Sequence, residues 1–473
     1  MTSAFSLRSQ GRQPPLPLSL ALPQGELHIE QWLRILPRKR LVGRGLLNGK
    51  PVLVKLFIAQ AAARHWQRES DGLRALRDAG LPTPALHAEG QLSGDLYYLV
   101  TEFLQDARTL EQLWQQLPGR NPGQPQAMAL LGAALRSLAA LHRQGLVQHD
   151  LHLGNFLQQG EQLYLIDGDA ISAVSPGQPL PAAQAEDNLA LLFAQLQPHW
   201  DELSELLLID YLQVNAERAL NPDRLQQHIA RARQHRLRDW LDKALRDCSA
   251  FAVERNWWRF CSVQRSQRDA LAPLLQNPDS AFTSHPSLKD GGSSSVTRVE
   301  QGGHSLVVKR YNIKGLGHWL RRCLRPSRAW HSWLAAQRLQ FLGIATPAPL
   351  AMIESRFGPL RRRAWLVTEY RQGQNLLELF GEDGQSLPTT EQQQALLQLM
   401  QQLTDAHISH GDFKATNLLW HNGQVWLIDL DAMQTHKTRT SWQPAWQTDR
   451  QRLIRNWPEN TPLHTWLKTH LPQ

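Results

Sequence analysis

The sequence predicts an α+β fold made of two similar domains in tandem, each with a small β-rich lobe followed by a helical lobe. The first observation is one pattern written twice: residues 149–157 read HDLHLGNFL and residues 411–419 read GDFKATNLL. The second is that each copy follows a strand-like stretch and then a helical stretch, in the same order. Self-similarity of this kind indicates repeated structural units.

The two copies also agree in their spacing. Twelve residues after the Asn of each pattern, an apolar pair ends in an aspartate, Asp167 or Asp429. The alignment continues without a gap to Asp187 and Asp449. A phosphoryl-transfer site needs such residues: one carboxylate accepts the proton of the attacking hydroxyl, while an amide and a second carboxylate hold the metal on the nucleotide phosphates. The sequence therefore predicts two kinase-like units.

The elements of the first copy can be predicted in order. Residues 34–42 and 51–57 have strand character and are joined through glycines, and a further strand ends at residues 97–103. Residues 60–79 carry apolar side chains at helical spacing. A second helix, at about 127–143, leads into the repeated pattern.

The second copy repeats these features. An apolar strand again ends in a lysine, Lys309, as the first does near Lys55. The Gly-x-x-Thr-Pro turn at 343–347 matches that at 80–84, and both copies then have a Thr-Glu-aromatic hinge.

The domain boundary is predicted from composition. The segment from Asp187 to about residue 262 has helical character, and residues 276–295 are rich in Ser, Gly and Pro. We therefore expect a first domain with a helical extension at 1–275, a linker at about 263–285 and a second domain at 276–473.

The strand lysines differ in their expected partners. A lysine at the end of a strand can simply extend to water, but Glu69 lies on the helix after Lys55 and suits an ion pair that orients the lysine on nucleotide phosphates. In the second copy Ser332 falls at the position of Glu69. Lys309 must therefore find another partner, or that half binds ATP less well.

Composition points to a reducing compartment. The three cysteines are scattered, which argues against a disulfide framework or a cysteine zinc site. The N-terminal stretch is a poor signal peptide, and no run of about 18 apolar residues is present, so we expect a cytoplasmic protein. Residues 246–473 hold 27 Lys/Arg against 18 Asp/Glu, which accounts for the whole net charge of +9, and 12 of the 17 Trp. Such a composition suits an anionic membrane surface or a phosphate-rich ligand.

The motifs resemble the protein-kinase-like superfamily and, within it, the bacterial lipopolysaccharide core kinases that phosphorylate Kdo or heptose. The second half carries the nearer likeness, in KRY at 309–311, LRPSRAW at 324–330 and HGDFKATN at 410–417. The first half is similar to aminoglycoside and choline kinases, because His152 lies two residues after Asp150. The resemblance covers most of residues 30–460.

The resemblance implies ATP and Mg as cofactors and a role for each matching residue. Asp150 and Asp412 would be catalytic bases, with Lys414 near the transferred phosphoryl group. Asp187 and Asp449 would brace the catalytic loops. The remaining implied residues are the metal ligands Asn155, Asp167, Asn417 and Asp429, and the nucleotide-binding residues Lys55, Glu69, Lys309, Glu102 and Glu369.

Two departures from the superfamily pattern stand out. The histidine before the catalytic aspartate is present as His410 but is Gln148 in the first half. The Asp-Phe-Gly motif is replaced by Asp-Gly-Asp at 167–169 and Asp-Leu-Asp at 429–431, which removes the Phe that sets active and inactive states.

The acceptor is expected to be small. Twenty residues between the metal-site aspartate and the bracing aspartate leave little room for a long activation loop, and neither copy has Ala-Pro-Glu. Residues 309–328 contain seven Lys or Arg and no acid, and the part at 314–328 predicts a basic amphipathic helix that lies on an anionic membrane. A solvated basic helix is the alternative. Nucleic-acid binding is a weaker alternative, because no recognised motif is present.

These observations predict an ATP- and Mg-dependent kinase, peripheral on the inner membrane, that phosphorylates a sugar hydroxyl of the lipopolysaccharide inner core or its lipid-linked precursor. The alternative is that one half is a pseudokinase and the protein acts as a regulatory or binding module, or phosphorylates another small molecule or a protein. The Ser332 substitution makes the second half the pseudokinase candidate, whereas Gln148 points to the first.

Overall fold

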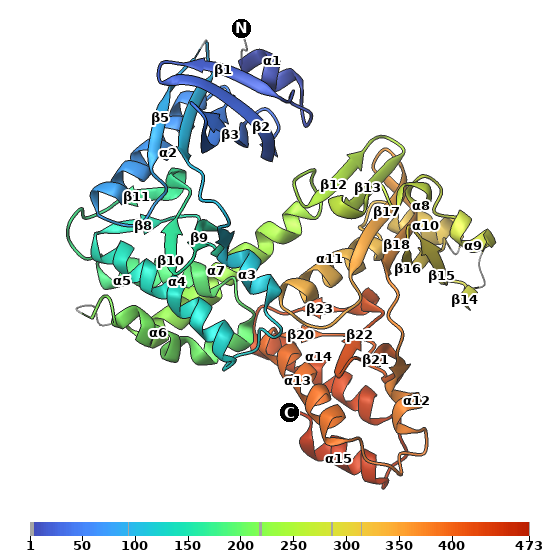
Figure 1. Ribbon diagram of the computed structural model, residues 1–473. Coiled ribbons are helices and arrows are strands. Elements are labelled where there is room, and N and C mark those ends of the chain that lie inside the picture. Colours follow the sequence, from blue (N-terminus) through green and yellow to red (C-terminus); the bar gives the residue numbers. More distant parts are fainter. Residues whose placement is uncertain (1–3, 93, 217–219, 285–286, 314, 473) are drawn as a thin grey trace. The chain divides into compact units, whose positions relative to one another are not determined.

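The computed structural model describes residues 4–92, 94–216, 220–284, 287–313 and 315–472. The chain folds into two compact units, Met1–Gln234 and His235–Gln473, and each combines strands with helices (Figure 1). The α+β class is confirmed. The division between the units falls inside helix α7 (Pro222–Lys243), whereas the sequence placed it near residue 275.

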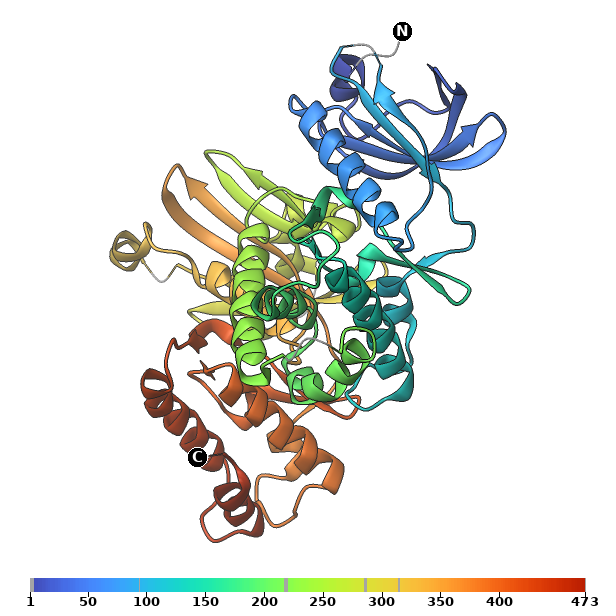
Figure 2. The same cartoon turned by 90° about the vertical axis from the view of Figure 1, so that its left-hand side faces the viewer.

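The first unit contains a six-stranded antiparallel sheet. Its strands pair in the order β1-β2-β3-β4-β6-β5, with β1 (Leu18–Leu22), β2 (Gly25–Leu36), β3 (Arg40–Leu47), β4 (Lys50–Phe57), β5 (Leu86–Gln91) and β6 (Tyr97–Glu102). Helix α2 (Ala62–Asp78) lies against this sheet and packs on it through Leu73, Phe57 and Leu99 (Figure 2). The predicted helix at 60–79 and the strand ending at 97–103 are confirmed.

One predicted strand is wrong. Residues 34–42 do not form a single strand, because Arg38 adopts a left-handed conformation with φ of 61° and turns the chain between β2 and β3. Gly43 and Gly45 lie inside β3 and not in a joining loop. At Gly45 a Cβ atom would lie 2.1 Å from the carbonyl oxygen of His28 in β2, so the close approach of these strands requires glycine.

The rest of the first unit is mostly helical and has its own apolar core. Helix α4 (Pro125–Arg143), predicted at 127–143, contributes much of this core. Its other elements are α1 (Ala4–Ser9), β7 (Arg108–Thr109), α3 (Leu110–Gln116), β8 (Leu146–Gln148), β9 (Phe156–Gln159), β10 (Gln162–Leu165), β11 (Ile171–Ala173), α5 (Ala182–Phe193), α6 (Ser204–Leu212) and most of α7, with short 3₁₀ turns at Leu153–Asn155, Gly168–Ala170 and Pro198–Leu203.

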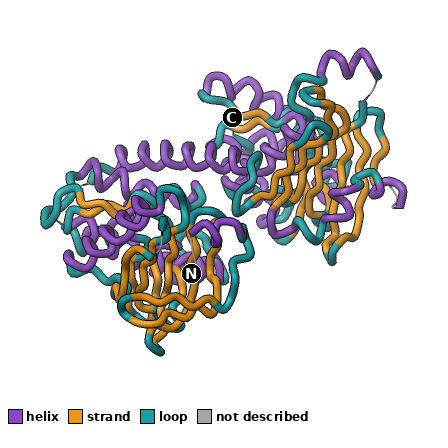
Figure 3. Tube along the Cα trace, turned by 90° about the horizontal axis from the view of Figure 1, so that it is seen from above, coloured by secondary structure: helices purple, strands orange, loops and turns teal. Residues whose placement is uncertain are grey.

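The second unit contains a seven-stranded antiparallel sheet, whose strands lie side by side in Figure 3. The order is β12-β13-β17-β18-β16-β15-β14, with β12 (Phe251–Arg255), β13 (Arg259–Gln264), β14 (Ser287–Asp290), β15 (Ser294–Gln301), β16 (His304–Tyr311), β17 (Pro349–Phe357) and β18 (Leu360–Glu369). Its strands β15-β16-β18-β17 follow the same order as β3-β4-β6-β5 of the first unit.

The predicted helix to residue 262 is wrong beyond α7. Residues 251–264 form the hairpin β12–β13, and β13 pairs with β17. This pairing buries Phe260, Cys261 and Val263, which a solvated helical extension would leave in water. The hairpin therefore belongs to the second unit.

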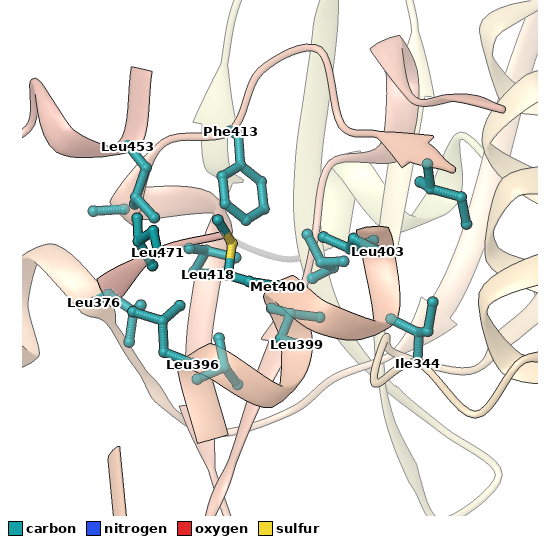
Figure 4. Packing of buried hydrophobic residues seen from close by; sticks show 14 of the residues in the cluster. Ile344, Leu376, Leu396, Leu399, Met400, Leu403, Phe413, Leu418, Leu453 and Leu471 are labelled. Atoms are coloured by element: carbon teal, nitrogen blue, oxygen red, sulfur yellow. The ribbon is translucent and has the colours of Figure 1, made fainter. Parts of the chain in front are cut away.

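The helical part of the second unit surrounds a large apolar cluster, part of which is drawn in Figure 4. Phe413 points into this cluster and is fully buried, so the backbone beside Asp412 is anchored in the core. The remaining elements are α8 (Ala272–Gln276), α9 (Ser280–Ser284), α10 (Leu316–Arg322), α11 (Arg328–Phe341), β19 (Gln374–Asn375), α12 (Leu376–Phe380), α13 (Thr390–Asp405), β20 (Ile408–Ser409), β21 (Leu418–His421), β22 (Gln424–Leu427), β23 (Gln434–Thr435), α14 (Arg439–Ile454) and α15 (Pro462–His470), with 3₁₀ turns at Arg265–Gln267, Ala415–Asn417 and Leu430–Ala432.

Candidate active site

In the first unit Lys55 of β4 meets Glu69 of α2, as the sequence predicted. The Lys55 ammonium forms an ion pair with Glu69, and it also lies 3.6 Å from Asp167 Oδ1. Arg40, which the sequence analysis missed, adds a second cation with its Nη1 3.2 Å from Glu69 Oε2. Burial raises the pKa of Glu69, and the two cations oppose that rise. Burial also disfavours ionised Asp167, but Lys55 and Arg40 together lower its pKa.

Two glycines let α2 approach the loop that carries Asp167. A Cβ atom at Gly72 would lie 2.0 Å from the carbonyl oxygen of Gly168. This approach allows the backbone N–H of Gly168 to donate a hydrogen bond of 3.1 Å to Glu69 Oε1. The Glu69 carboxylate thus links the strand, the helix and the loop.

The loop around Asp150 is open to solvent. The Asp150 side chain is 74% exposed, and His152 Nε2 lies 4.0 Å from its Oδ2. Asn155 is buried and donates from Nδ2 to the carbonyl oxygen of Asp150 at 2.6 Å. Gln148 fills the position of the expected histidine and its Nε2 lies 3.5 Å from the carbonyl oxygen of Asp167.

Asp187 does not brace this loop, contrary to the sequence prediction. Its side chain is 67% exposed and pairs with His228. The next residue, Asn188, is buried and forms two hydrogen bonds with the backbone of Gln148. Its Nδ2 donates to the Gln148 carbonyl oxygen at 2.7 Å, and its Oδ1 accepts from the Gln148 N–H at 3.4 Å. The gapless alignment placed Asp187 opposite Asp449, but the residue that holds the loop is Asn188, one position later. Successive residues on a helix point about 100° apart, so the side chain of Asp187 faces away from the loop.

In the second unit Lys309 finds a partner that the sequence analysis did not identify. Its Nζ lies 2.6 Å from Asp429 Oδ1 and 2.9 Å from Asp431 Oδ2. Ser332, at the position of Glu69, donates to Asp431 Oδ1 at 2.7 Å, and Arg328 Nη2 lies 2.6 Å from Oδ2. The acid that holds the lysine is therefore on the loop and not on the helix.

The Asp431 carboxylate is strongly stabilised. Lys309 and the hydroxyl groups of Tyr311 and Ser332 overcome the cost of burial and lower its pKa to about 2. The Tyr311 hydroxyl donates to Asp431 Oδ1 at 2.7 Å, and burial together with this anion raises the pKa of Tyr311 well above its ordinary value.

The loop around Asp412 is held from two sides. Asp449 is buried and accepts hydrogen bonds from the N–H groups of His410 at 2.6 Å and Gly411 at 3.0 Å, as the sequence predicted. His410 lies 3.0 Å, through Nε2, from the carbonyl oxygen of Ile428, and its Nδ1 accepts from the N–H of Asp412 at 3.3 Å. Burial lowers the pKa of His410, which favours the neutral ring that these contacts require.

Basic side chains surround the Asp412 carboxylate. Lys414 Nζ lies 3.0 Å from Oδ2 and Arg452 Nη1 lies 3.5 Å from Oδ1. Asn417 donates from Nδ2 to the carbonyl oxygen of Asp412 at 2.9 Å. Arg452 was not predicted. Asp412 is thus partly shielded, in contrast to Asp150.

A cavity of about 350 Å³ lies between the sheet and the helical part of the second unit. Apolar side chains from both parts line it, among them Val296, Val307 and Leu419. Lys309, Asn417, Asp429 and Asp431 lie on its wall, and Glu369 belongs to the hinge at its edge. In the first unit Glu102 is exposed, and its N–H donates to the carbonyl oxygen of Ala85 at 2.8 Å.

The donor atoms suit a hard divalent cation. Asn417 uses its Nδ2 for the loop, which leaves its Oδ1 available beside Asp429. In the first unit Asp167 Oδ1 is buried and has no hydrogen-bond partner among the described residues. Within the same described residues, no three His, Cys, Asp or Glu side chains form a metal cluster. Oxygen donors from one amide and one carboxylate fit Mg²⁺ that completes its shell with water and phosphate oxygens.

No helix in the part of the chain that the structure describes is long and apolar enough to cross a bilayer.

Comparison with known proteins gives one match by sequence family. The family model described as lipopolysaccharide kinase (Kdo/WaaP) matches residues 53–174 and 276–462, which is more than half of the chain and includes both loops. A search of curated proteins found no match.

Solved structures of kinases are also similar to this chain. WaaP in complex with acyl carrier protein is 22% identical and covers 43% of this chain and 88% of its own, with a TM-score of 0.34. The PknI kinase domain of Mycobacterium tuberculosis is 16% identical and covers 45% of this chain and 99% of its own, with a TM-score of 0.29.

Proposed function

The chain belongs to the lipopolysaccharide kinase (Kdo/WaaP) family and is a phosphotransferase with an alcohol group as acceptor, and from this we propose that it transfers the γ-phosphoryl group of ATP to a sugar hydroxyl of the lipopolysaccharide inner core, presented at the inner membrane on its cytoplasmic side. We further propose that each unit is a bilobal kinase-like domain and that the second unit carries out the transfer.

One observation carries the assignment to the second unit: Asp412 lies on a loop that is fixed by Asp449 and His410, and Lys414 is within 3.0 Å of its carboxylate. A carboxylate held in a fixed position keeps the acceptor hydroxyl in a reactive geometry. Such positioning is a large part of phosphoryl-transfer catalysis. The cavity with Lys309, Asn417 and Asp429 on its wall supports the same assignment.

The residues then have distinct roles in the reaction. Asp412 accepts the proton of the acceptor hydroxyl as the oxygen attacks phosphorus. Lys414 and Arg452 offset the negative charge that gathers around the transferred group. Lys309 holds the nucleotide phosphates, and the apolar walls of the cavity hold the adenine ring of ATP. Asn417 and Asp429 would hold Mg²⁺, which supplies positive charge to the phosphates.

For the first unit we propose nucleotide binding without transfer. Its Lys55, Glu69 and Asp167 cluster suits nucleotide phosphates, but Asp150 is largely in solvent and has His152 in place of a lysine. That combination favours a pseudokinase that supports the second unit.

Helix α10 supports docking on an anionic membrane. Its Arg321 and Arg322, and Arg325 just after it, are exposed, as are Leu320 (61%) and Leu324 (70%). Lys314, part of the predicted segment, lies outside the described residues. Each cation near anionic lipid contributes about 1 kcal/mol.

Exposed aromatic side chains extend this surface. Trp257 and Trp258, at the turn between β12 and β13, are 57% and 64% exposed and pack against Phe357 at the neighbouring turn. Tryptophan favours the membrane–water interface. We expect Trp257→Ser with Trp258→Ser to weaken binding to anionic vesicles in a sedimentation assay. Unchanged sedimentation would show that these rings take no part.

The transfer itself is tested with radiolabelled ATP, Mg²⁺ and purified core lipopolysaccharide. Label should enter the lipopolysaccharide, and chelation of divalent metal should stop it. A soluble core oligosaccharide is the second acceptor, and a general protein substrate such as casein is the control. Label in the protein substrate but in neither sugar acceptor would contradict the proposal.

A further inference from the structure

A second cavity in the second unit is lined, among the described residues, by neutral and basic side chains alone. It measures about 190 Å³ and lies between α10, the start of α11 and strand β18. No acidic residue lines it in the described structure, and five arginines do: Arg322, Arg325, Arg328, Arg361 and Arg362.

The cavity is built from structured backbone. The N–H of Arg361 donates to the carbonyl oxygen of Cys323 at 2.7 Å, and Trp319 Nε1 donates to the carbonyl oxygen of Arg361 at 2.7 Å. These bonds fasten the end of α10 to β18. Ser327 accepts a hydrogen bond from the N–H of Trp330 and fixes the start of α11.

The arginines are incompletely neutralised. Arg361 lies 3.5 Å from Glu354, but that carboxylate also pairs with Arg356, and Arg361 Nη1 is buried without a hydrogen-bond partner among the described residues. Arg328 shares Asp431 with Lys309. Arg322, Arg325 and Arg362 form no ion pair with another residue in the described part of the chain, and all three are exposed.

We propose that this cavity binds a phosphomonoester group through Arg322, Arg325 and the neighbouring guanidinium groups. Arginine presents paired N–H donors that match the oxygens of phosphate, and charge-assisted bonds of this kind are among the strongest in proteins. A cavity that gathers five such groups without an acid selects a compact, doubly charged anion over a diffuse negative surface.

The phosphate group can come from a soluble ester or from a lipid headgroup. Leu320 and Leu324 are exposed on and just after α10, where they could enter a bilayer beside a headgroup. Phosphate binding by the cavity does not depend on the proposed function. Only a lipid source of the phosphate rests on it, because it requires docking on a membrane. A discrete site differs from general membrane attraction, because it requires particular arginines and not merely their charge.

Two double variants with equal charge separate these cases. Arg322→Gln with Arg325→Gln removes two cavity arginines. Arg321→Gln with Arg363→Gln removes two exposed arginines that do not line the cavity, one from α10 and one from β18. Inorganic phosphate is titrated by calorimetry without ATP or acceptor, so that a failure of phosphoryl transfer does not affect the result. Arg362→Gln is the substitute if the cavity variant does not fold.

We expect wild type and the Arg321/Arg363 variant to bind phosphate alike. The cavity variant should bind phosphate at least about tenfold more weakly, because it loses charge-assisted hydrogen bonds to the phosphate oxygens. The lipid arm compares vesicles of phosphatidic acid with vesicles of phosphatidylglycerol at matched charge. If the protein prefers phosphatidic acid and only the cavity variant loses this preference, the phosphate group comes from a lipid headgroup. Equal losses in both variants, or no cavity-dependent binding in either arm, would overturn the proposal.

Discussion

The acid that holds the strand lysine comes from a different element in each unit. In the first unit Glu69 on α2 holds Lys55, while Asp169 on the loop is taken by Arg68 Nε at 3.1 Å. In the second unit Asp431, at the position of Asp169, holds Lys309. The lysine is thus held by the helix acid in the first unit and by the loop acid in the second, and in both it lies near the preceding aspartate, Asp167 or Asp429.

Replacing Asp431 tests this exchange. Asp431→Asn removes the carboxylate that Lys309 and Arg328 share and leaves Lys309 with Asp429 alone. Losing one member of a buried pair costs about 3–5 kcal/mol. We expect urea unfolding of the second unit to shift to lower concentration and nucleotide binding to weaken. Glu382→Gln, an exposed change of equal charge, should stay within about 0.5 kcal/mol.

A compensating variant sharpens the result. Ser332→Glu in the Asp431→Asn background returns the acid to the helix, as in the first unit, and should restore part of the lost stability. If Asp431→Asn unfolds like wild type, the loop carboxylate does not hold Lys309.

His142 makes the first unit sensitive to acid. It is fully buried between Tyr211 and Asn188, and burial lowers its pKa from 6.5 to about 4. Between these values the unfolded state binds a proton that the folded state does not, so stability is lost as pH falls from about 6.5 to 4 and not above that range. The shift corresponds to about 3 kcal/mol.

Urea unfolding of the first unit at several pH values measures this loss. His142→Gln lowers stability by itself, so the test compares the slopes of stability against pH. The slope between pH 6.5 and 4 should flatten in the variant. Parallel profiles would show that other groups cause the acid sensitivity.

At the level of elements, periodicity predicted the central strands and helices, because a buried face repeats along β4, α2 and α4. It failed at β12–β13. The apolar runs there are short, and their period does not distinguish a strand from a buried helix. Only the pairing of β13 with the distant β17 decides the matter, and that contact is not local in sequence.

Helix α2 lies so close to the Asp167 loop that we expect a side chain at Gly72 to destabilise the first unit. Gly72→Ala should favour the helix by about 1 kcal/mol from propensity alone. A Cβ atom there would meet the carbonyl oxygen of Gly168, so we expect the opposite sign: lower stability of the first unit and faster hydrogen exchange at the Gly168 amide. If Gly72→Ala instead stabilised the first unit by about 1 kcal/mol, the contact between α2 and Gly168 would not be as close as described.

Spacing in the sequence predicted the repeated site residues and the Lys55–Glu69 ion pair, but not the other ion pairs of the site. Lys55 with Glu69, and Asp449 with the Asp412 loop, followed from position in the sequence. Asp431 could have been suspected, because it repeats at the position of Asp169. Arg40 and Arg452 carried no such signal, since each reaches the site from an element whose placement depends on tertiary contacts.

At the scale of the whole molecule, we propose different roles for two related units. They share a four-strand arrangement and a loop with the same spacing, yet only the second surrounds its aspartate with Lys414 and Arg452 and braces it with an aspartate. The first has the Lys55, Glu69 and Asp167 cluster, for which we propose phosphate binding, but its Asp150 is exposed. Duplication of the fold therefore need not mean duplication of the chemistry.

The most direct test compares Asp412→Asn with Asp150→Asn in the transfer of label from ATP to core lipopolysaccharide. Both changes keep the size of the side chain and remove one carboxylate. Asp412→Asn should reduce the transfer rate by about 10²–10⁴-fold without unfolding the protein, because it removes the proposed general base. Asp150→Asn should retain most of the activity. Full activity in Asp412→Asn together with loss in Asp150→Asn would contradict the assignment to the second unit, and full activity in the double variant would contradict the proposed role of both aspartates.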